Sequence, residues 1–285
     1  MSFGSFSDYN LQLSQNYYTF MANIRNSIIV IVLTILLLNC EKTNITIAKN
    51  NQSDKKWISL FNGKDLQGWQ VKIKGHPLGV NWNNTFKVVD GVLSVDYEGY
   101  ENFNNSFGHI FYKTPYSNYK LKLKYRFTGN QVTGGENWAL KNSGVMIHCQ
   151  SPESMELNQD FPVCLEVQLL GGVTEGEKRT TGNLCTPGSY VVMNNEEVTE
   201  HCIDSNSDTY YGDQWVDLEV IVWNDSIISH HINGKKVIEY SKPKIGGEYN
   251  TLIDMEFTPM EKGFISLQSE SHPVEFKNIM LLPLE

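Results

Sequence analysis

From residue 57 to the C-terminus, the sequence consists largely of short segments in which apolar and polar residues alternate. In Lys120–Phe127, one face would carry only leucine and aromatic side chains, and the other only lysine and arginine. Successive side chains of a strand point to opposite faces of a sheet, so this alternation predicts a strand with one buried face. Asp90-Gly91 and Asn233-Gly234 separate such segments and are typical of tight hairpin turns. No long helix can be placed in this region, and the pattern therefore predicts an all-β sandwich of two antiparallel sheets.

The first 40 residues are expected to be a signal peptide. Arg25 precedes an apolar stretch at residues 28–38, and Cys40 follows it after Asn39. An apolar stretch of about 11 residues suits a signal peptide and is short for a membrane span. A cysteine directly after it is typical of bacterial lipoprotein signals, although Asn39 replaces the usual small residue. We therefore expect lipidation at Cys40 and an exported lipoprotein, anchored to a membrane in the periplasm or at the cell surface. Cleavage at another position and an uncleaved anchor are the alternatives.

The segment between the signal peptide and the first strand is expected to be a tether. Residues 41–56 are rich in asparagine, lysine and threonine and show no apolar period. This composition predicts a flexible linker. The folded part is then expected at residues 57–285, as a single β domain. Residues 1–20 contain no positive charge, so Met21 is an alternative start of translation.

The charge balance and the missing motifs argue against two classes of ligand. The chain has 32 acidic and 23 basic residues, which give a formal net charge of −9. No run of lysine or arginine could follow a phosphate backbone, so we expect no nucleic-acid partner. The chain contains neither a P-loop nor the glycine-rich motif of dinucleotide-binding folds, so no nucleotide cofactor is expected.

Two further alternating segments carry polar side chains that could form a site. In residues 142–150, His148 and Gln150 fall on one face, and in residues 163–172, Glu166 and Gln168 do the same. If the two strands are neighbours, these four side chains form one polar patch backed by an aliphatic layer, which suits a sugar site. The alternative is an ordinary strand with one solvent-exposed face.

The cysteines of the folded part predict one disulfide. Cys185 and Cys202 flank a predicted hairpin at residues 190–199, so they could face each other across it. Cys149 and Cys164 fall on opposite faces by their parity in the two strands, which argues against their pairing. We therefore expect a Cys185–Cys202 disulfide and two free thiols, with four free thiols as the alternative.

The chain from about Trp57 to Glu285 resembles the 3-keto-disaccharide hydrolase domain family. The motifs that carry the resemblance follow the family's order: Leu60–Leu66 with Gly68-Trp69, Val89–Leu93, Asn142–Val145, Glu166–Gln168, Ile232–Gly234, Ile265–Gln268 and Pro273–Ile279. The resemblance implies a concanavalin A-like jelly-roll sandwich and an exported bacterial protein that acts on sugars oxidised at C3. The family often has arginine shortly after its Asn-Ser-Gly motif, where this chain has His148-Cys149-Gln150. This departure leaves the identity of the substrate sugar undetermined.

The second strand has a single carboxylate, Glu166, and this bears on the type of reaction. A conventional glycoside hydrolase needs two carboxyl groups that flank the bond, and Gln168 cannot ionise where a second acid would be expected. In a 3-keto sugar, the ketone acidifies the proton at C2, so one base can start an elimination that releases the group at C1. The resemblance therefore favours Glu166 as this base or as a metal ligand. His148 is expected to be the electrophile, the acid for the leaving group or a second ligand.

The remaining expectations concern binding. We expect Gln150, Gln168, Gln268 and Asn183 to hold sugar hydroxyls, and Trp138 to stack on a sugar face. A divalent metal ion held by His148 and Glu166 could polarise the ketone. The expected function is cleavage of 3-keto-glycosides, with a sugar 3-dehydrogenase as the upstream partner. A lectin-like binding module without catalysis and a conventional glycoside hydrolase are the alternatives.

Overall fold

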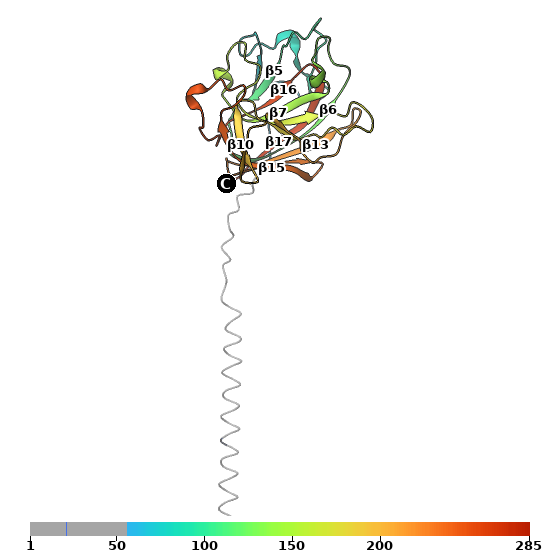
Figure 1. The fold of residues 1–285 in the computed structure, drawn as a ribbon. Coiled ribbons are helices and arrows are strands. Elements are labelled where there is room, and N and C mark those ends of the chain that lie inside the picture. The colour runs from blue at the N-terminus through green and yellow to red at the C-terminus, as the bar shows by residue number, and fades with distance from the viewer. Residues whose placement is uncertain (1–20, 22–55) are drawn as a thin grey trace, which may run out of the picture. The chain divides into compact units, whose positions relative to one another are not determined.

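The computed structural model describes Met21 and residues 56–285 (Figure 1). Lys55–Glu285 form one compact unit. The expected signal peptide, the lipidation site Cys40 and nearly all of the expected tether lie outside the described residues. In the part of the chain that is described, no helix is long and apolar enough to cross a membrane.

The fold is an all-β sandwich of two antiparallel sheets, as predicted. The larger sheet has ten strands in the order β11-β10-β15-β14-β13-β6-β17-β4-β3, with β1 paired to β17. Its strands are β1 (Ile58–Ser59), β3 (Phe86–Val89), β4 (Val92–Val95), β6 (Asn118–Phe127), β10 (Ser189–Met193), β11 (Glu196–Val198), β13 (Val216–Trp223), β14 (Ile227–Ile232), β15 (Lys235–Ile245) and β17 (Val274–Pro283).

The smaller sheet has seven strands in the order β12-β9-β8-β7-β16-β5-β2. Its strands are β2 (Trp69–Ile73), β5 (Gly108–Tyr112), β7 (Asn142–Cys149), β8 (Leu165–Leu170), β9 (Asn183–Cys185), β12 (Cys202–Ile203) and β16 (Phe264–Ser269). The helical segments of the described residues are short 3-10 turns, η1 (Trp82–Asn84), η2 (Asn137–Ala139), η3 (Pro152–Ser154) and η4 (Ile253–Met255).

The predicted turns connect neighbouring strands of the larger sheet. Asp90 and Gly91 have φ values of 50° and 80° and join β3 to β4. Asn233 and Gly234, with φ values of 47° and 80°, join β14 to β15 in the predicted meander. Residues with positive φ at both central positions give the turn that matches the twist of a hairpin, which explains why Asn-Gly and Asp-Gly stand there.

The core lies between the two sheets and is built by the alternating faces. The apolar face of β6 is buried, whereas its lysine and arginine side chains are half-buried or exposed. It packs in one cluster with the inward residues of β7 and β8, which are Val145, Ile147, Leu165, Val167 and Leu169. These residues share one face, so the polar residues Glu166 and Gln168 of β8 point to the opposite face of the smaller sheet.

A β-bulge in β7 overturns one expectation from residue parity. The pairing of β7 with β16 advances from Phe264↔Cys149 to Ser266↔Met146, so β7 holds one extra residue there. His148, at φ 51°, is the residue of this bulge with left-handed backbone. Because the bulge shifts the alternation by one residue, Cys149 lies in the same small apolar cluster as Met146 and Cys164. The two cysteines therefore share a face, contrary to the parity argument, although both thiols are free.

The predicted disulfide closes the neighbouring edge of this sheet. Cys185 of β9 and Cys202 of β12 are directly paired residues and form a disulfide. The hairpin predicted between them is formed by β10 and β11. The disulfide holds β12 against β9 at the end of the sheet where Glu166, the register partner of Cys185, also lies.

Candidate active site

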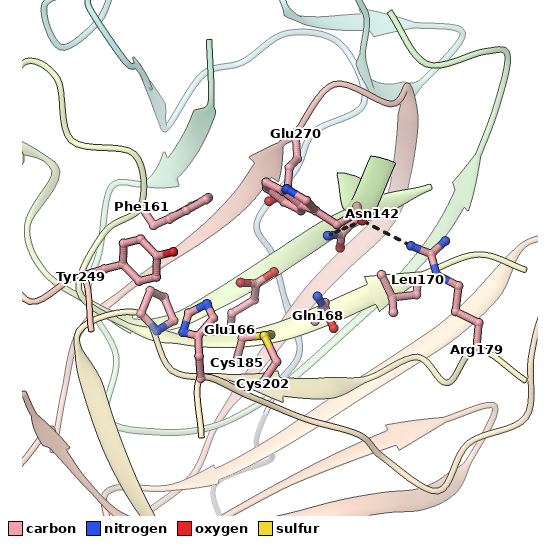
Figure 2. A pocket seen from close by; sticks show the side chains of 13 residues that line it. Asn142, Phe161, Glu166, Gln168, Leu170, Arg179, Cys185, Cys202, Tyr249 and Glu270 are labelled. Carbon is pink, nitrogen blue, oxygen red and sulfur yellow. Dashed lines mark hydrogen bonds between the residues drawn. A yellow bond between two sulfur atoms is a disulfide. The ribbon is translucent and has the colours of Figure 1, made fainter. Parts of the chain in front are cut away.

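The outer face of the smaller sheet carries a cavity of about 300 Å³ (Figure 2). A cavity of this volume is at the lower end of those that bind small ligands, and it suits a single sugar ring. Its walls combine the carboxyl groups of Glu166 and Glu270 with the aromatic rings of Trp138, Phe161 and Tyr249. Polar groups that alternate with aromatic faces are typical of carbohydrate sites, because sugars present both hydroxyl groups and apolar C–H faces.

A row of paired residues from five strands crosses this face, and four of the five are polar. The register places Asn183 beside Gln168, and Gln168 beside Gly144. On the other side of β7, Gln268 pairs with His109 of β5, and the pairing of Leu267 with Val145 places Gln268 beside Gly144. Laterally paired residues point to the same face of a sheet, so side chains distant in the sequence meet here. The Gln268 Oε1 atom and both His109 ring nitrogens are buried without a hydrogen-bond partner.

Glu166 is the best-placed base in the cavity. Its side chain is only 6% exposed, lines the cavity and makes no hydrogen bond or ion pair with any described residue. Burial raises the pKa of Glu166 to about 8, because the charged form loses its hydration without gaining a cation. A carboxyl group with a pKa near neutrality can accept a proton from carbon and release it again, which suits general base catalysis.

Gly144 explains why the Glu166 carboxylate lies where it does. A Cβ atom added at Gly144 would lie 2.5 Å from Glu166 Oε1 and 2.9 Å from its Cγ and Cδ atoms. The side chain of Glu166 therefore passes directly over β7 at the one position that has no side chain. The glycine of the Asn-Ser-Gly segment is thus part of the site, since it makes room for the carboxylate.

Glu270 is a second buried carboxyl group in the same cavity, and it was not predicted from the sequence. Its side chain is 3% exposed, and its Oε2 atom has no hydrogen-bond partner. Its Oε1 atom accepts a hydrogen bond of 3.4 Å from Gln268 Nε2. Burial is the main cause that raises the pKa of Glu270 well above its ordinary value. The charge of Glu166 raises this pKa further, while the positive charge of Arg179 lowers it. A detectable signal was the alternation along β16, since Glu270 follows Gln268 at a spacing of two.

Arg179 and Asn142 lie at the end of the cavity away from Tyr249 (Figure 2). The Arg179 guanidinium donates hydrogen bonds to the carbonyl oxygens of Gly171 at 2.7 Å and Lys141 at 3.3 Å. The Asn142 Nδ2 atom donates to the Trp138 carbonyl oxygen at 3.4 Å, and the Asn142 Oδ1 atom is buried without a donor. This end of the cavity therefore offers a fixed cation and a free acceptor, which suit the oxygen atoms and hydroxyl groups of a sugar.

The predicted binding residues differ in their positions. Gln168 and Trp138 line the cavity, and the Trp138 side chain, 51% exposed, offers a free ring face. Asn183 is buried below the cavity, where its Nδ2 atom donates to Gln168 Oε1 at 3.1 Å and its Oδ1 atom accepts from Ser205 N at 2.9 Å. Asn183 therefore positions Gln168, and the predicted direct sugar contact is wrong. Gln268 is fully buried beside the cavity, where it contacts Glu270.

His148 and Gln150 do not belong to this cavity. The Nε2 atom of His148 lies 3.1 Å from the Asn224 carbonyl oxygen, in the turn that joins β13 to β14. The side chain of Gln150 accepts from Gln159 Nε2 at 2.9 Å and Val163 N at 2.6 Å, so it holds the loop between β7 and β8 together. The predicted four-residue patch is therefore wrong for these two residues, because the bulge at His148 turns the strand out of the common face.

The separation of His148 from Glu166 also removes the metal pair predicted from the sequence. Histidine and carboxylate ligands must both lie about 2 Å from one ion. Here the Glu166 side chain lines the cavity, whereas the His148 side chain contacts the turn at Asn224. Among the described residues, no group of three or more histidine, cysteine, aspartate or glutamate side chains is arranged to hold a metal ion.

Two histidines outside the predicted site have lowered pKa values. His201 lines it and packs its ring against Tyr249 at 5.1 Å, although its place next to Cys202 marks only a hairpin residue in the sequence. Burial lowers the pKa of His201. His272 is buried without a hydrogen bond at either nitrogen, and burial together with Lys141 and Arg179 lowers its pKa to about 4. Both imidazoles are therefore neutral at neutral pH.

The fold is a jelly roll of the concanavalin A-like type, with a polar and aromatic cavity on its smaller sheet. The profile of one domain family, described as a 3-keto-alpha-glucoside-1,2-lyase-like domain, matches residues 56–282. The chain belongs to this family, which confirms the resemblance seen in its motifs and gives it a carbohydrate-active role. A search of curated proteins found none that matches the chain.

Solved structures share the fold at low sequence identity. A protein of Parabacteroides distasonis ATCC 8503, provisionally described as a glycosyl hydrolase, is 20% identical with a TM-score of 0.51, over 83% of this chain and 97% of that chain. The β-glucanase of Bacillus licheniformis is 11% identical with a TM-score of 0.44, over 81% and 98% of the two chains. The carbohydrate-binding module CBM66 of Bacillus subtilis is 10% identical with a TM-score of 0.40, over 75% and 95%. At 20% identity, the Parabacteroides protein supports the fold alone.

Proposed function

We propose that this protein cleaves the glycosidic bond of 3-keto-glycosides, and that Glu166 removes the proton at C2 of the oxidised sugar. The observation that carries this proposal is the Glu166 carboxyl group, which is buried, free of partners and open to a cavity of the size of a sugar ring. The description of the family supports the choice of a 3-keto sugar. A buried base with a pKa near 8 suits a carbon acid that a neighbouring ketone has activated.

The reaction follows from the position of the ketone. Removal of the C2 proton by Glu166 places the electron pair on the C3 oxygen as an enolate. Return of this pair forms a double bond between C1 and C2, and the bond between C1 and the glycosidic oxygen breaks. Addition of water to the double bond then gives net hydrolysis, and release of the unsaturated sugar gives elimination. No electron leaves the sugar, so the reaction needs no oxidant.

The polar groups of the cavity have distinct parts in this reaction. Arg179 is the cation near the cavity, and it stabilises negative charge that develops on the substrate oxygen atoms. Asn142 Oδ1, which has no donor in the fold, accepts a hydrogen bond from a sugar hydroxyl. Gln168 is held by Asn183 and binds a further hydroxyl, while Trp138 stacks on the sugar face. Fixed groups of this kind lower the cost of ordering the substrate.

Conventional glycoside hydrolysis is the second candidate, because Glu270 supplies the second carboxyl group that the sequence analysis did not find. Two carboxyl groups that face one cavity are the basic requirement of retaining and inverting enzymes. A lectin-like module without catalysis would bind its sugar in the same cavity, and Trp138 would stack on the sugar in that case too. The three functions differ in whether the substrate must carry a ketone at C3 and whether any bond breaks.

The test compares a 3-keto-glycoside with its unoxidised parent, each with and without a chelator. We expect cleavage of the keto form alone, because only its C2 proton is acidic enough for Glu166. Cleavage of the parent at a similar rate would support a conventional hydrolase and overturn the proposal. Binding of both compounds without cleavage of either would support the lectin-like function. The chelator tests the divalent metal ion expected from the sequence. Loss of activity in its presence would indicate that the site binds such an ion.

The proposal also places the protein in a reaction sequence and a compartment. A 3-keto sugar must come from an oxidation of the C3 hydroxyl, so an oxidoreductase such as a sugar 3-dehydrogenase would act before this protein. The sequence of residues 1–40 supports export, and Cys40 supports a lipid anchor at a membrane. We propose on this basis that the domain acts outside the cytoplasm, in the periplasm or at the cell surface.

A further inference from the structure

Glu270 has a buried carboxyl group that the proposed C2 deprotonation does not use. It directly follows the last residue of β16, and the register of β16 with β7, continued past its last pair, places it beside Asn142. Glu166 approaches from β8, on the opposite side of β7, and its carboxylate lies over Gly144. The two carboxyl groups thus enter one cavity from two sides of the same strand (Figure 2).

The two positions on β7 that Glu166 and Glu270 adjoin are about one sugar ring apart. Gly144 and Asn142 are two residues apart on β7, which corresponds to about 7 Å along an extended strand. A pyranose ring placed between the carboxyl groups would present its C2 hydrogen to one side and the glycosidic oxygen to the other. One cavity therefore offers a group at each of the two bonds that the elimination must break.

The surroundings of Glu270 favour its neutral form. No ion pair of the described residues includes Glu270, and the Arg179 guanidinium is bound to the carbonyl oxygens of Gly171 and Lys141. Burial and the nearby charge of Glu166 both raise the pKa of Glu270. Two carboxylates that share a dry cavity cannot both ionise easily, so the proton stays on one of them. Because burial raises the pKa of Glu166 to about 8 and the pKa of Glu270 is also raised, Glu166 ionises first and Glu270 keeps its proton when Glu166 acts as the base.

We propose that Glu270 is the proton donor to the leaving group in the cleavage of 3-keto-glycosides. This inference rests on the proposed function. Glu166 takes the C2 proton, the C1–O bond breaks as the C1–C2 double bond forms, and the Glu270 proton goes to the departing oxygen. The products are an alcohol and an unsaturated 3-keto sugar. Glu270 is then ionised and can take a proton from the water that adds to C1, while Glu166 returns its proton to C2.

The experiment measures how the loss in Glu270→Gln depends on the leaving group. Two 3-keto-glucosides are compared, one with a 4-nitrophenyl group, which leaves without protonation, and one with a methyl group, which requires it. For methyl, we expect kcat/KM to fall by about 100-fold or more, in the range of general acid catalysis. For 4-nitrophenyl, the loss should be at least about tenfold smaller, because the acid contributes little there. Glu270→Asp keeps an acid and should show the same dependence in weaker form.

Exchange of the C2 hydrogen in deuterated water separates this inference from the proposed function. In Glu270→Gln, the methyl substrate should still exchange its C2 hydrogen, because Glu166 is intact. If the wild-type protein neither exchanges this hydrogen nor cleaves either substrate, the proposed function fails as a whole. If the wild type does both and Glu270→Gln loses the same factor with both leaving groups, only the assignment of Glu270 is overturned.

Tyr249 and His201 are the other groups that line the cavity and carry a proton that could be donated. Tyr249→Phe and His201→Gln are therefore measured with the same two substrates. We expect neither variant to discriminate between the leaving groups. A selective loss with the methyl substrate in either variant, together with its absence in Glu270→Gln, would transfer the role to that residue and overturn the proposal. Glu261→Gln changes an exposed carboxyl group of the loop before β16 and is the matched control.

Discussion

Glu166→Gln should lower kcat/KM for a 3-keto-glycoside by about 10²- to 10⁴-fold, the usual contribution of a general base. Glutamine has nearly the same shape as glutamate but cannot accept the C2 proton. The fold should be kept, because the wild-type side chain makes no hydrogen bond or ion pair that the variant would lose, and the neutral amide avoids the cost of a buried charge. Thermal unfolding and the cleavage rate of the same preparation provide the measurement.

The pH dependence of this effect has a definite sign. Burial raises the pKa of Glu166 to about 8, and the base acts in its ionised form. In the wild type, kcat/KM should therefore rise with pH through about 8 and fall by about tenfold for each pH unit below that value. Glu270 and Cys164 interact electrostatically with Glu166, so the observed midpoint belongs to the group as a whole. The remaining activity of Glu166→Gln should lack this rise, and Glu261→Gln should retain both rate and profile.

Gly144→Ala should also remove most of the activity, by about 100-fold, without any change in a catalytic group. The added methyl group would lie 2.5 Å from Glu166 Oε1, so the carboxylate must leave its position above β7. Gly144 is not among the residues with positive φ, so alanine is compatible with its backbone. Displacement of a base by about 1 Å is enough for a loss of this size. Cleavage assays with melting temperatures would detect it.

Gly234→Ala is the control for a loss of stability alone. Gly234 has φ 80° and open space around it, so alanine there strains the turn between β14 and β15 without touching the cavity. We expect this variant to melt at a lower temperature and to keep its kcat/KM below that temperature. If Gly144→Ala retained full activity, Gly144 would have no part in placing Glu166. If it unfolded under the assay conditions, the glycine would serve the fold and not the site.

The regular parts of the fold could be predicted from the sequence because they depend on local patterns. The alternation in Lys120–Phe127 gave the buried and open faces of β6, and the Asp-Gly and Asn-Gly pairs gave the turns. The flanking of a hairpin by Cys185 and Cys202 was enough to predict their disulfide. In each case a short segment determines the geometry, and the rest of the chain does not alter it.

The site was predicted only in part, because it depends on the register of strands that are distant in the sequence. Glu166 and Gln168 were found because β8 is regular. His148 was misplaced because one extra residue in β7 reverses the alternation, and no sequence rule marks where a bulge falls. Glu270 and Arg179 reach the cavity from β16 and from the segment before β9, so only the sheet order brings them to Glu166.

The cavity combines side chains from regular strands with side chains from loops. Glu166 and Gln168 belong to β8, and Glu270 follows β16. The opposite faces of these two strands pack in the core. The aromatic walls, Trp138, Phe161 and Tyr249, come from connections between strands. A strand therefore holds the proposed base, the end of a second strand holds the proposed acid, and the loops would determine which sugar fits.

The central claim is that Glu166 breaks the bond between C2 and its hydrogen, and a 3-keto-glycoside deuterated at C2 tests it most directly. With a substrate whose leaving group is good, the deuterated form should be cleaved several-fold more slowly than the unlabelled form in the wild-type protein. This result would mean that the C2 hydrogen is removed in the step that limits the rate. Equal rates for the two forms, combined with slower cleavage when deuterium stands at C1, would contradict the account and indicate conventional glycoside hydrolysis by Glu166 and Glu270.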